Sequence, residues 1–179
     1  YTDGSLEFKK ALQIFHVPHD VSVPYDPASN GVAENSIRRL KEGTRCTFVQ
    51  SGFSPEWWAE AVRCYCNYRN VTDLFHQETP YFRRHGVNYS GPRIPFGAAI
   101  RYLPHGLLGN EQHTFGHKTR LGFYMGIELD SKQRFKGNCF ILDAEQFGLA
   151  SHASEVHLQR VKHKEIISCK WPAPFFPLE

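Results

Sequence analysis

The chain has 179 residues, of which 41% are hydrophobic and 22% are charged, and its formal net charge at pH 7 is +3. These values are ordinary for a globular protein with one core or two small ones. Five cysteines in a chain of this length exclude a disulfide scaffold, and no apolar run approaches the roughly 20 residues that span a membrane. Because the chain begins with Tyr1 and its one methionine is Met125, we expect it to belong to a longer polyprotein.

An acidic residue, Asp3, precedes the turn residues Gly4 and Ser5 near the start of the chain. This pattern predicts the end of a strand, followed by a short helix with one apolar side that we expect to be buried. That side consists of Leu6, Phe8, Ala11, Leu12 and Phe15. Val21 and Val23 then indicate an extended stretch.

A second helix is predicted after two prolines, Pro24 and Pro27, which keep the chain out of a helix before residue 28. Ser29, Asn30 and Gly31 follow as candidates for its cap. The pattern therefore predicts a helix that starts close to residue 31.

A row of charged residues follows on this predicted helix, at positions i, i+4, i+7 and i+11: Glu34, Arg38, Lys41 and Arg45. At about 100° per residue they share one side of the helix. A carboxylate at the head of a row of cations suits a site that holds a metal ion and then follows a polyanion. The alternative is structural, because the helix dipole alone favours an acid in the first turn and such cations often form a solvated face.

Two acids, Asp3 and Glu34, lie on different predicted elements with 30 residues between them. The intervening chain is long enough to fold back and bring the two carboxylates together. Facing carboxylates can hold divalent cations that activate a water or a 3′ hydroxyl and stabilise a phosphoryl leaving group. The pair therefore predicts a metal-dependent site for phosphoryl transfer.

A third helix is predicted from Ser54, because Pro55 suits its first position and an acid follows in its first turn. Trp57 and Tyr68 are expected to cover a neighbouring surface. The core side at helical spacing is predicted to be Trp58, Ala61, Val62 and Tyr65.

The pattern changes after residue 86, where glycines and prolines indicate a linker at 86–92. Short β-like runs then indicate a small β domain at 93–165: Ala98–Leu103, Arg120–Ile127, Asn138–Leu142 and Val156–Val161. An extended tail is expected at 166–179. The cations of the β domain are candidates for DNA contact, or else belong to a merely solvated hairpin: Lys118, Arg120, Lys132, Arg134 and Lys136.

Several ordered motifs over about the first 85 residues resemble the integrase core of a Ty1/copia-type LTR retrotransposon. They are Asp3 with Glu7-Phe8, then Val23-Pro24-Tyr25-Asp26-Pro27, then Asn30-Gly31-Val32-Ala33-Glu34, and Trp57-Trp58-Ala59-Glu60-Ala61. The resemblance implies an α/β fold, with a partial RNase H-like core at 1–85 and an SH3-like β-barrel at 93–165. The implied activity is metal-dependent processing of DNA 3′ ends and their transfer to target DNA.

The same resemblance implies roles for individual residues. Asp3 and Glu34 match the second and third acids of a D,D-E triad that binds Mg²⁺ or Mn²⁺. The residues expected near or on the DNA are Asn30, Arg38, Lys41 and Arg45. The implied partners are element ends and target DNA, further copies of the chain on that DNA, and the rest of a Pol polyprotein, in the nucleus and in cytoplasmic virus-like particles. No membrane partner is expected.

The chain also departs from the family pattern. Asp3-Gly4-Ser5 stands where Asp-Asn-Gly is usual, and the interval to Glu34 is a few residues short. The first acid of the triad is expected upstream of residue 1, since Asp20 and Asp26 are poorly placed for that role, so we expect no strand transfer from these residues alone. Two other functions stay open: a catalytically inactive nucleic-acid-binding or assembly remnant of a decayed element, and an RNase H-like nuclease.

Overall fold

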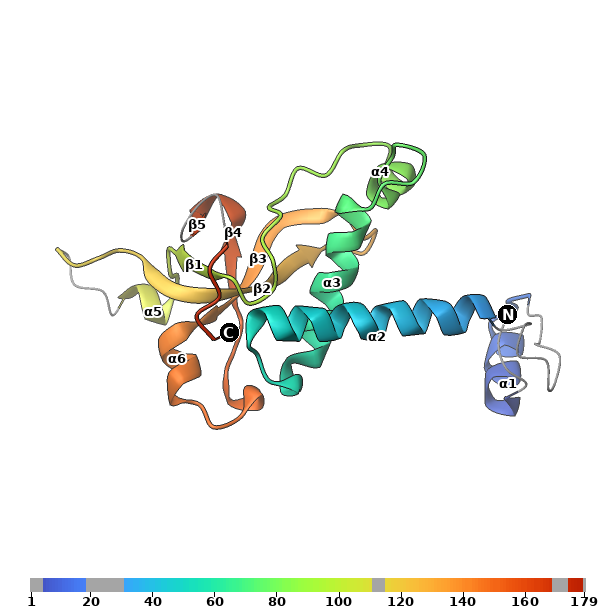
Figure 1. The fold of residues 1–179 in the computed structure, drawn as a ribbon, viewed down its shortest axis with the longest axis horizontal. Helices are drawn as coiled ribbons and strands as arrows, with labels where there is room; N and C mark the ends of the chain where they lie inside the picture. The colour runs from blue at the N-terminus through green and yellow to red at the C-terminus, as the bar shows by residue number, and fades with distance from the viewer. Residues whose placement is uncertain (1–4, 19–30, 111–114, 169–173, 179) are drawn as a thin grey trace. The chain divides into compact units, whose positions relative to one another are not determined.

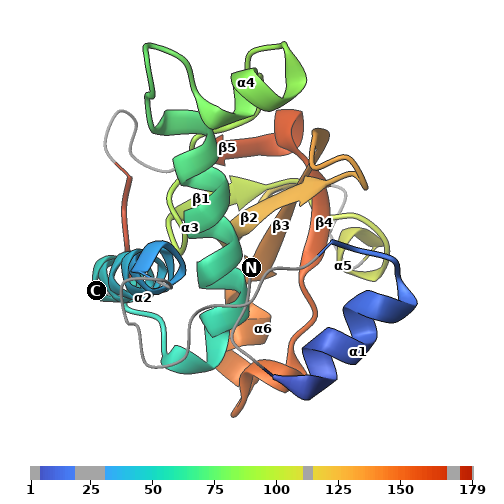
Figure 2. The same ribbon diagram turned by 90° about the vertical axis from the view of Figure 1, so that its right-hand side faces the viewer.

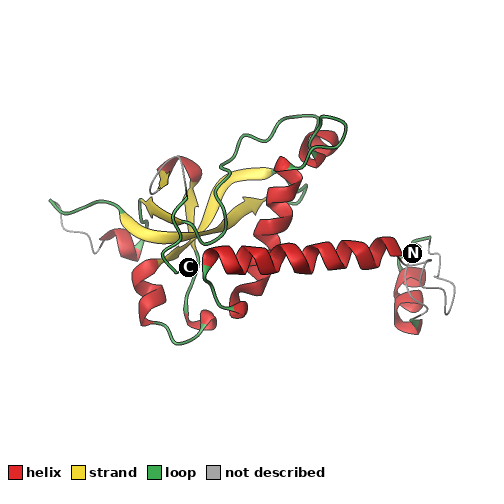
Figure 3. Cartoon of the chain, viewed as in Figure 1, coloured by secondary structure: helices red, strands yellow, loops and turns green. Residues whose placement is uncertain are grey.

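The computed structural model describes residues 5–18, 31–110, 115–168 and 174–178, and it divides into two compact units, Tyr1–Glu42 and Gly43–Glu179. The first unit contains α1 (Leu6–Ile14) and the beginning of α2 (Gly31–Ser51). The second unit contains the end of α2 and all the later elements, which include a five-stranded sheet (Figures 1 and 3). The chain is therefore of mixed helix and strand, as predicted.

The first helix, α1, begins where a serine caps it. The Ser5 hydroxyl accepts a hydrogen bond from the Phe8 backbone N–H at 3.4 Å and donates one to the Glu7 carboxylate at 2.9 Å. A backbone N–H and this hydroxyl both stabilise the charged form, so the pKa of Glu7 is lowered. These local bonds set the start of the helix without help from a core.

The apolar side of α1 is exposed, so the prediction that it is buried is wrong. Leu6 is 68% exposed, Phe8 55% and Phe15 74%, and no residue of the helix is buried. An amphipathic helix buries its apolar side only where another element packs on it. The described part of the first unit supplies no such element.

The second helix, α2, is described from Gly31 onward, and the prediction of a helix after Pro24 and Pro27 is confirmed over Gly31–Ser51. Its buried residues, Thr44 and Ser51, both belong to the second unit. At Gly43 the helix passes directly under the ring of Tyr65, and a Cβ at this position would overlap that ring. Glycine therefore permits the close approach of α2 to the next helix.

Two neighbouring tryptophans at the start of α3 have opposite environments. The helix is preceded by the 3₁₀ turn η2 (Pro55–Trp57) and runs over Trp58–Thr72. Trp57 is 5% exposed and Trp58 is 64% exposed, so the predicted core position at Trp58 is wrong. The buried positions keep the helical spacing, but the row starts one residue earlier than predicted: Trp57, Ala61, Cys64 and Val71.

A single antiparallel sheet forms the centre of the second unit and curls into a half-barrel (Figure 1). Its strands are β1 (Ala99–Tyr102), β2 (Arg120–Leu129), β3 (Phe135–Asp143), β4 (Gln159–Lys162) and β5 (Ile166–Ser168). The order β4-β3-β2-β1-β5 is a four-stranded meander whose first strand also pairs with the last one. The four predicted β runs are confirmed as strands, with changed ends, whereas β5 was not predicted.

Helices cover this sheet, and Figure 2 shows α3 running across it. Seven consecutive residues of β2 are buried, from Gly122 to Glu128. In a strand, alternate side chains point to opposite faces, so both faces of β2 are covered. The elements in contact with β2 include α3 and α6 (Ala144–Leu149).

An aromatic cluster joins the residues before 86–92 to the sheet after them. The ring of Phe53 lies 5.4 Å from that of Phe96 and 5.3 Å from those of Phe123 and Phe147, between centroids. Such edge and tilted contacts stabilise a core beyond the area that they bury. Side chains on either side of 86–92 thus share one core. The division into domains at 1–85 and 93–165 stays a prediction.

The segment predicted as a linker is held in place. It follows α4 (Pro80–His85), which Thr79 caps through a hydrogen bond from the Phe82 backbone N–H at 3.2 Å. Within the segment, the Tyr89 hydroxyl donates to the Pro92 carbonyl at 3.0 Å, and its ring centroid lies 5.6 Å from that of Phe135. Tyr89 therefore fastens this stretch to β3.

Short elements complete the half-barrel: α5 (Leu107–Asn110), and the 3₁₀ turns η3 (Ala153–Glu155) and η4 (His163–Glu165). The described part of the tail, residues 174–178, lies against the protein's own core. The Ala99 backbone N–H donates to the Phe175 carbonyl at 2.8 Å, and Leu178 packs on the hydrophobic core. This hydrogen bond holds the described part of the tail beside the start of β1.

Candidate nucleic-acid and metal site

The predicted row of charged residues lies on α2, and each of its side chains is exposed. Glu34, Arg38 and Lys41 occupy successive turns of the helix in the first unit, and Arg45 follows in the second unit. At helical spacing Glu34, Arg38 and Lys41 share one side of the part of α2 that belongs to the first unit. An exposed row of this kind can approach the phosphates of a nucleic acid without any change in the fold.

The guanidinium of Arg38 has a neighbour on the same helix. Its Nη2 donates to the Asn35 side-chain oxygen at 3.0 Å. This neutral partner orients the guanidinium without neutralising its charge. Arg38 can therefore still donate to a phosphate from its other N–H groups.

Two predicted site residues, Asp3 and Asn30, lie outside the described residues. Glu34 is in the first turn of α2 and is exposed, where the helix dipole favours a carboxylate. The meeting of Asp3 with Glu34, and the Mg²⁺ or Mn²⁺ that they would hold, stay predictions. Across residues 5–18, 31–110, 115–168 and 174–178, no three His, Cys, Asp or Glu side chains form a group suited to a metal ion.

Among the cations of the sheet, Arg120 is committed to a buried acid. Its Nε donates to Asp143 at 2.8 Å and its Nη2 donates to Glu145 at 2.6 Å. The hydrogen bond to Asp143 raises the pKa of Arg120, and its side chain is 20% exposed. Arg120 thus holds the end of β3 to the start of β2 and is a poor candidate for DNA contact.

The other candidate cations differ in how far carboxylates compensate them. Arg134 lies 3.4 Å from Asp130, and Lys136 lies 3.2 Å from Glu128. Lys118 and Lys132 are exposed. Local acids therefore weaken the positive field along β3, and α2 carries the stronger candidate for a polyanion.

A further concave site was not predicted. It lies at one end of the half-barrel, and its lining comes from the segment after β1, from α6 and from the start of β4. Sequence reasoning missed it because these segments carry no motif and meet only through the curl of the sheet.

No protein-family model matches this chain, and no curated protein matches it either. In the described residues, no helix combines the length and apolar character that crossing a membrane requires.

Proposed function

We propose that the chain acts in DNA integration, as the later part of a metal-dependent integrase of the Ty1/copia type. The observation that carries this proposal is the exposed row on α2, in which one carboxylate, Glu34, precedes cations at successive turns. Glu34 would supply one ligand of a divalent metal ion, and Arg38, Lys41 and Arg45 would hold DNA phosphates.

The half-barrel supports the same proposal. A four-stranded meander, followed by a 3₁₀ turn and a fifth strand that returns to the first, is compatible with the SH3-like barrel that the resemblance implies after the integrase core.

In the proposed mechanism, Asp3 and Glu34 would hold a divalent cation together with a further carboxylate that the resemblance implies. When bound, this metal would supply activation of the attacking oxygen and stabilisation of the leaving one. The chain's own cations fix the register of the DNA but carry no sequence information. Asn30 would line the loop close to the scissile phosphate.

The proposal is tested with a protein extended upstream by the segment that carries the implied first acid. We expect joining of DNA ends that depends on Mg²⁺ or Mn²⁺ and that Glu34→Gln abolishes, while Glu42→Gln on the same helix leaves it unchanged. Joining that survives Glu34→Gln would remove this residue from the mechanism.

The phosphate-binding role has a separate test on the chain itself. Arg38→Ala and Lys41→Ala should each weaken binding of duplex DNA and lower the slope of log K against log salt by about 0.9 per lost contact. A slope that stays the same or steepens would contradict that role. DNA binding without joining, in the extended protein, would instead favour the inactive nucleic-acid-binding remnant.

A further inference from the structure

The concave site at the end of the half-barrel is a groove with a volume of about 720 Å³. We name it the mouth groove, and the residues that define it here are His105, Leu108, Gln146, Leu149, Val156 and Gln159. Gln159 pairs in register with Ile141, which is fully buried. Since cross-strand partners stand on the same face of a sheet, the groove lies directly above the barrel core.

The walls of the mouth groove are held by hydrogen bonds. His105 Nε2 lies 2.7 Å from a carboxylate oxygen of Glu165, which ties the segment after β1 to η4. On the opposite wall, the backbone N–H of Gln146 donates to the buried Asp143 carboxylate at 3.1 Å, which fixes the start of α6. A groove that is already formed loses little entropy when it binds a ligand.

The charge of the mouth groove disfavours a nucleic acid. Its ten lining residues, all of them described, include no lysine or arginine, two histidines (His105 and His157) and one acid, Glu155. Lys162 and Lys164 lie further along the same stretch of chain and do not line it. A carboxylate without lysine or arginine repels phosphate and attracts a basic side chain.

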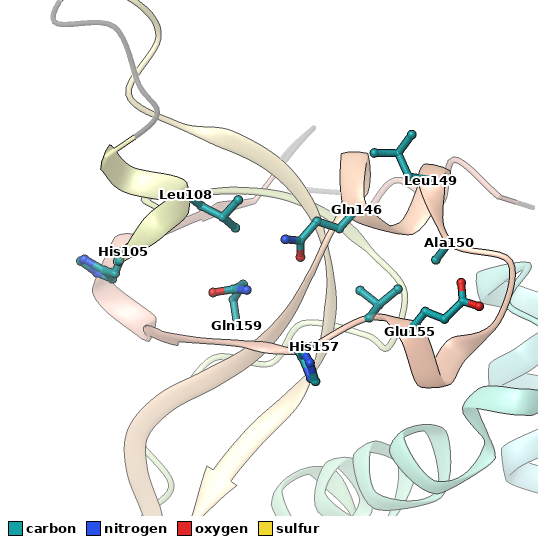
Figure 4. Close-up of a pocket in the computed structure, with 10 residues that line it drawn as sticks. His105, Leu108, Gln146, Leu149, Ala150, Glu155, His157 and Gln159 are labelled. Carbon is teal, nitrogen blue, oxygen red and sulfur yellow. The ribbon is translucent and has the colours of Figure 1, made fainter.

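The remaining lining residues match a polypeptide. Figure 4 shows Gln146 of α6 and Gln159 of β4 projecting into the space between these elements. Each carboxamide both donates and accepts, as peptide groups do. Leu108, Leu149 and Val156 add apolar surface. The strand that reaches the groove, β4, pairs with β3 on one side, and no other strand of the described residues pairs with its outer edge, which is the kind of edge to which an extended peptide adds.

We propose that the mouth groove binds an extended peptide segment of a protein partner. Apolar side chains of that segment contact Leu108, Leu149 and Val156, its backbone bonds to the two glutamines, and a lysine or arginine lies beside Glu155. This site is separate from the row on α2, so it extends the proposed function rather than restating it.

A phage-displayed library of random short peptides, selected on the full chain, tests the proposal. We expect enriched peptides to combine aliphatic residues with a lysine or arginine. Synthetic copies should shift the backbone amide NMR signals of Gln146, Leu149 and Gln159. Ala150→Trp, which fills the groove, should weaken peptide binding at least about tenfold, which is a loss of about 1.4 kcal/mol of binding free energy.

Two milder variants keep the test decisive if the tryptophan variant fails to fold. Leu149 is 83% exposed, so Leu149→Ser should preserve folding and still weaken binding. Glu155→Gln should weaken the binding of basic peptides about threefold, as expected for the loss of an exposed ion pair. The control is Glu78→Gln, which changes an exposed acid outside the groove and should leave peptide binding unchanged. The proposal is overturned if no selected peptide binds more tightly than about 1 mM, if the shifts map elsewhere, or if an oligothymidine strand shifts the groove amides equally.

Discussion

The Tyr102 hydroxyl donates a 2.6 Å hydrogen bond to the carboxylate of Asp143, which lies 41 residues later in the chain. This bond joins β1 to the end of β3, and both residues are fully buried. The Asp143 carboxylate also accepts hydrogen bonds from the Arg120 guanidinium and from the backbone N–H groups of Glu145 and Gln146. One carboxylate thereby connects three strands and the first turn of α6.

Removing the hydroxyl of Tyr102 should destabilise the second unit. Hydrogen bonds to charged groups contribute about 1.5–3 kcal/mol, so Tyr102→Phe should lower the free energy of unfolding by about this amount. Urea unfolding followed by circular dichroism measures the loss. Tyr68→Phe is the matched control, because Tyr68 is 42% exposed. Equal stability of the two variants would show that the hydroxyl contributes nothing net.

The same carboxylate predicts a dependence of stability on pH. Burial would raise the pKa of Asp143, but hydrogen bonds from Arg120 and Tyr102 outweigh it and leave the pKa lowered. A carboxyl whose pKa is lower in the folded state stabilises the fold above its unfolded-state pKa of about 3.9. That contribution is lost as the pH falls through the lower, folded-state pKa.

Asp143→Asn tests this dependence. The variant should be less stable than the parent at neutral pH, and the difference between them should shrink as the pH falls below about 4. Other carboxyls with lowered pKa, such as Glu128 and Asp130, titrate in both proteins and cancel in the comparison. A difference that stays constant down to pH about 2 would contradict a charged Asp143.

The two tryptophans at the start of α3 provide a matched pair of variants. Trp57→Ala removes a buried side chain from the aromatic cluster and should cost about 3–5 kcal/mol in the free energy of unfolding. Trp58→Ala changes an exposed residue and should cost less than about 1 kcal/mol. Thermal unfolding of both variants measures the contrast. The reverse order would mean that the first turn of the helix places Trp58 inside.

Thiol reactivity should distinguish the cysteines. Burial raises the pKa of Cys64 and of Cys139 to about 12, whereas Cys46 is exposed. Because the thiolate is the reactive form, iodoacetamide at pH about 8 should modify Cys46 in the folded protein and leave the other two until denaturant is added. Mass spectrometry of digested samples reads the outcome. Rapid labelling of Cys139 in the folded state would indicate that β3 opens readily.

Local patterns in the sequence predicted the elements better than they predicted burial. The helical run of α2 after Pro24 and Pro27 and the Ser54-Pro55 start before α3 are set by backbone chemistry within a few residues, and both were readable from sequence. To predict which of Trp57 and Trp58 is buried, one must know the rotational phase of a helix that a 3₁₀ turn precedes. No residue type in the sequence indicates that turn. The exposed side of α1 depended on whether another element covers it, and that is not a local property.

The candidate site divides in the same way. The row on α2 follows from helical spacing alone, so its residues could be selected before the fold was known. The hydrogen bond from Arg120 to Asp143 could not be predicted from sequence, because the two residues are 23 positions apart and meet through the pairing of β2 with β3. The mouth groove was hidden for the same reason.

The position of β1 has a consequence for how the protein is synthesised. One edge of this strand pairs with β2, but its other edge pairs with β5, which is synthesised much later. The Ala99 N–H likewise bonds to Phe175, later still in the chain. A ribosome adding about 5–20 residues per second therefore exposes an open strand edge for several seconds before β5 emerges. An unpaired edge invites pairing with another chain, so products that stop before β5 should aggregate more readily than products that include it.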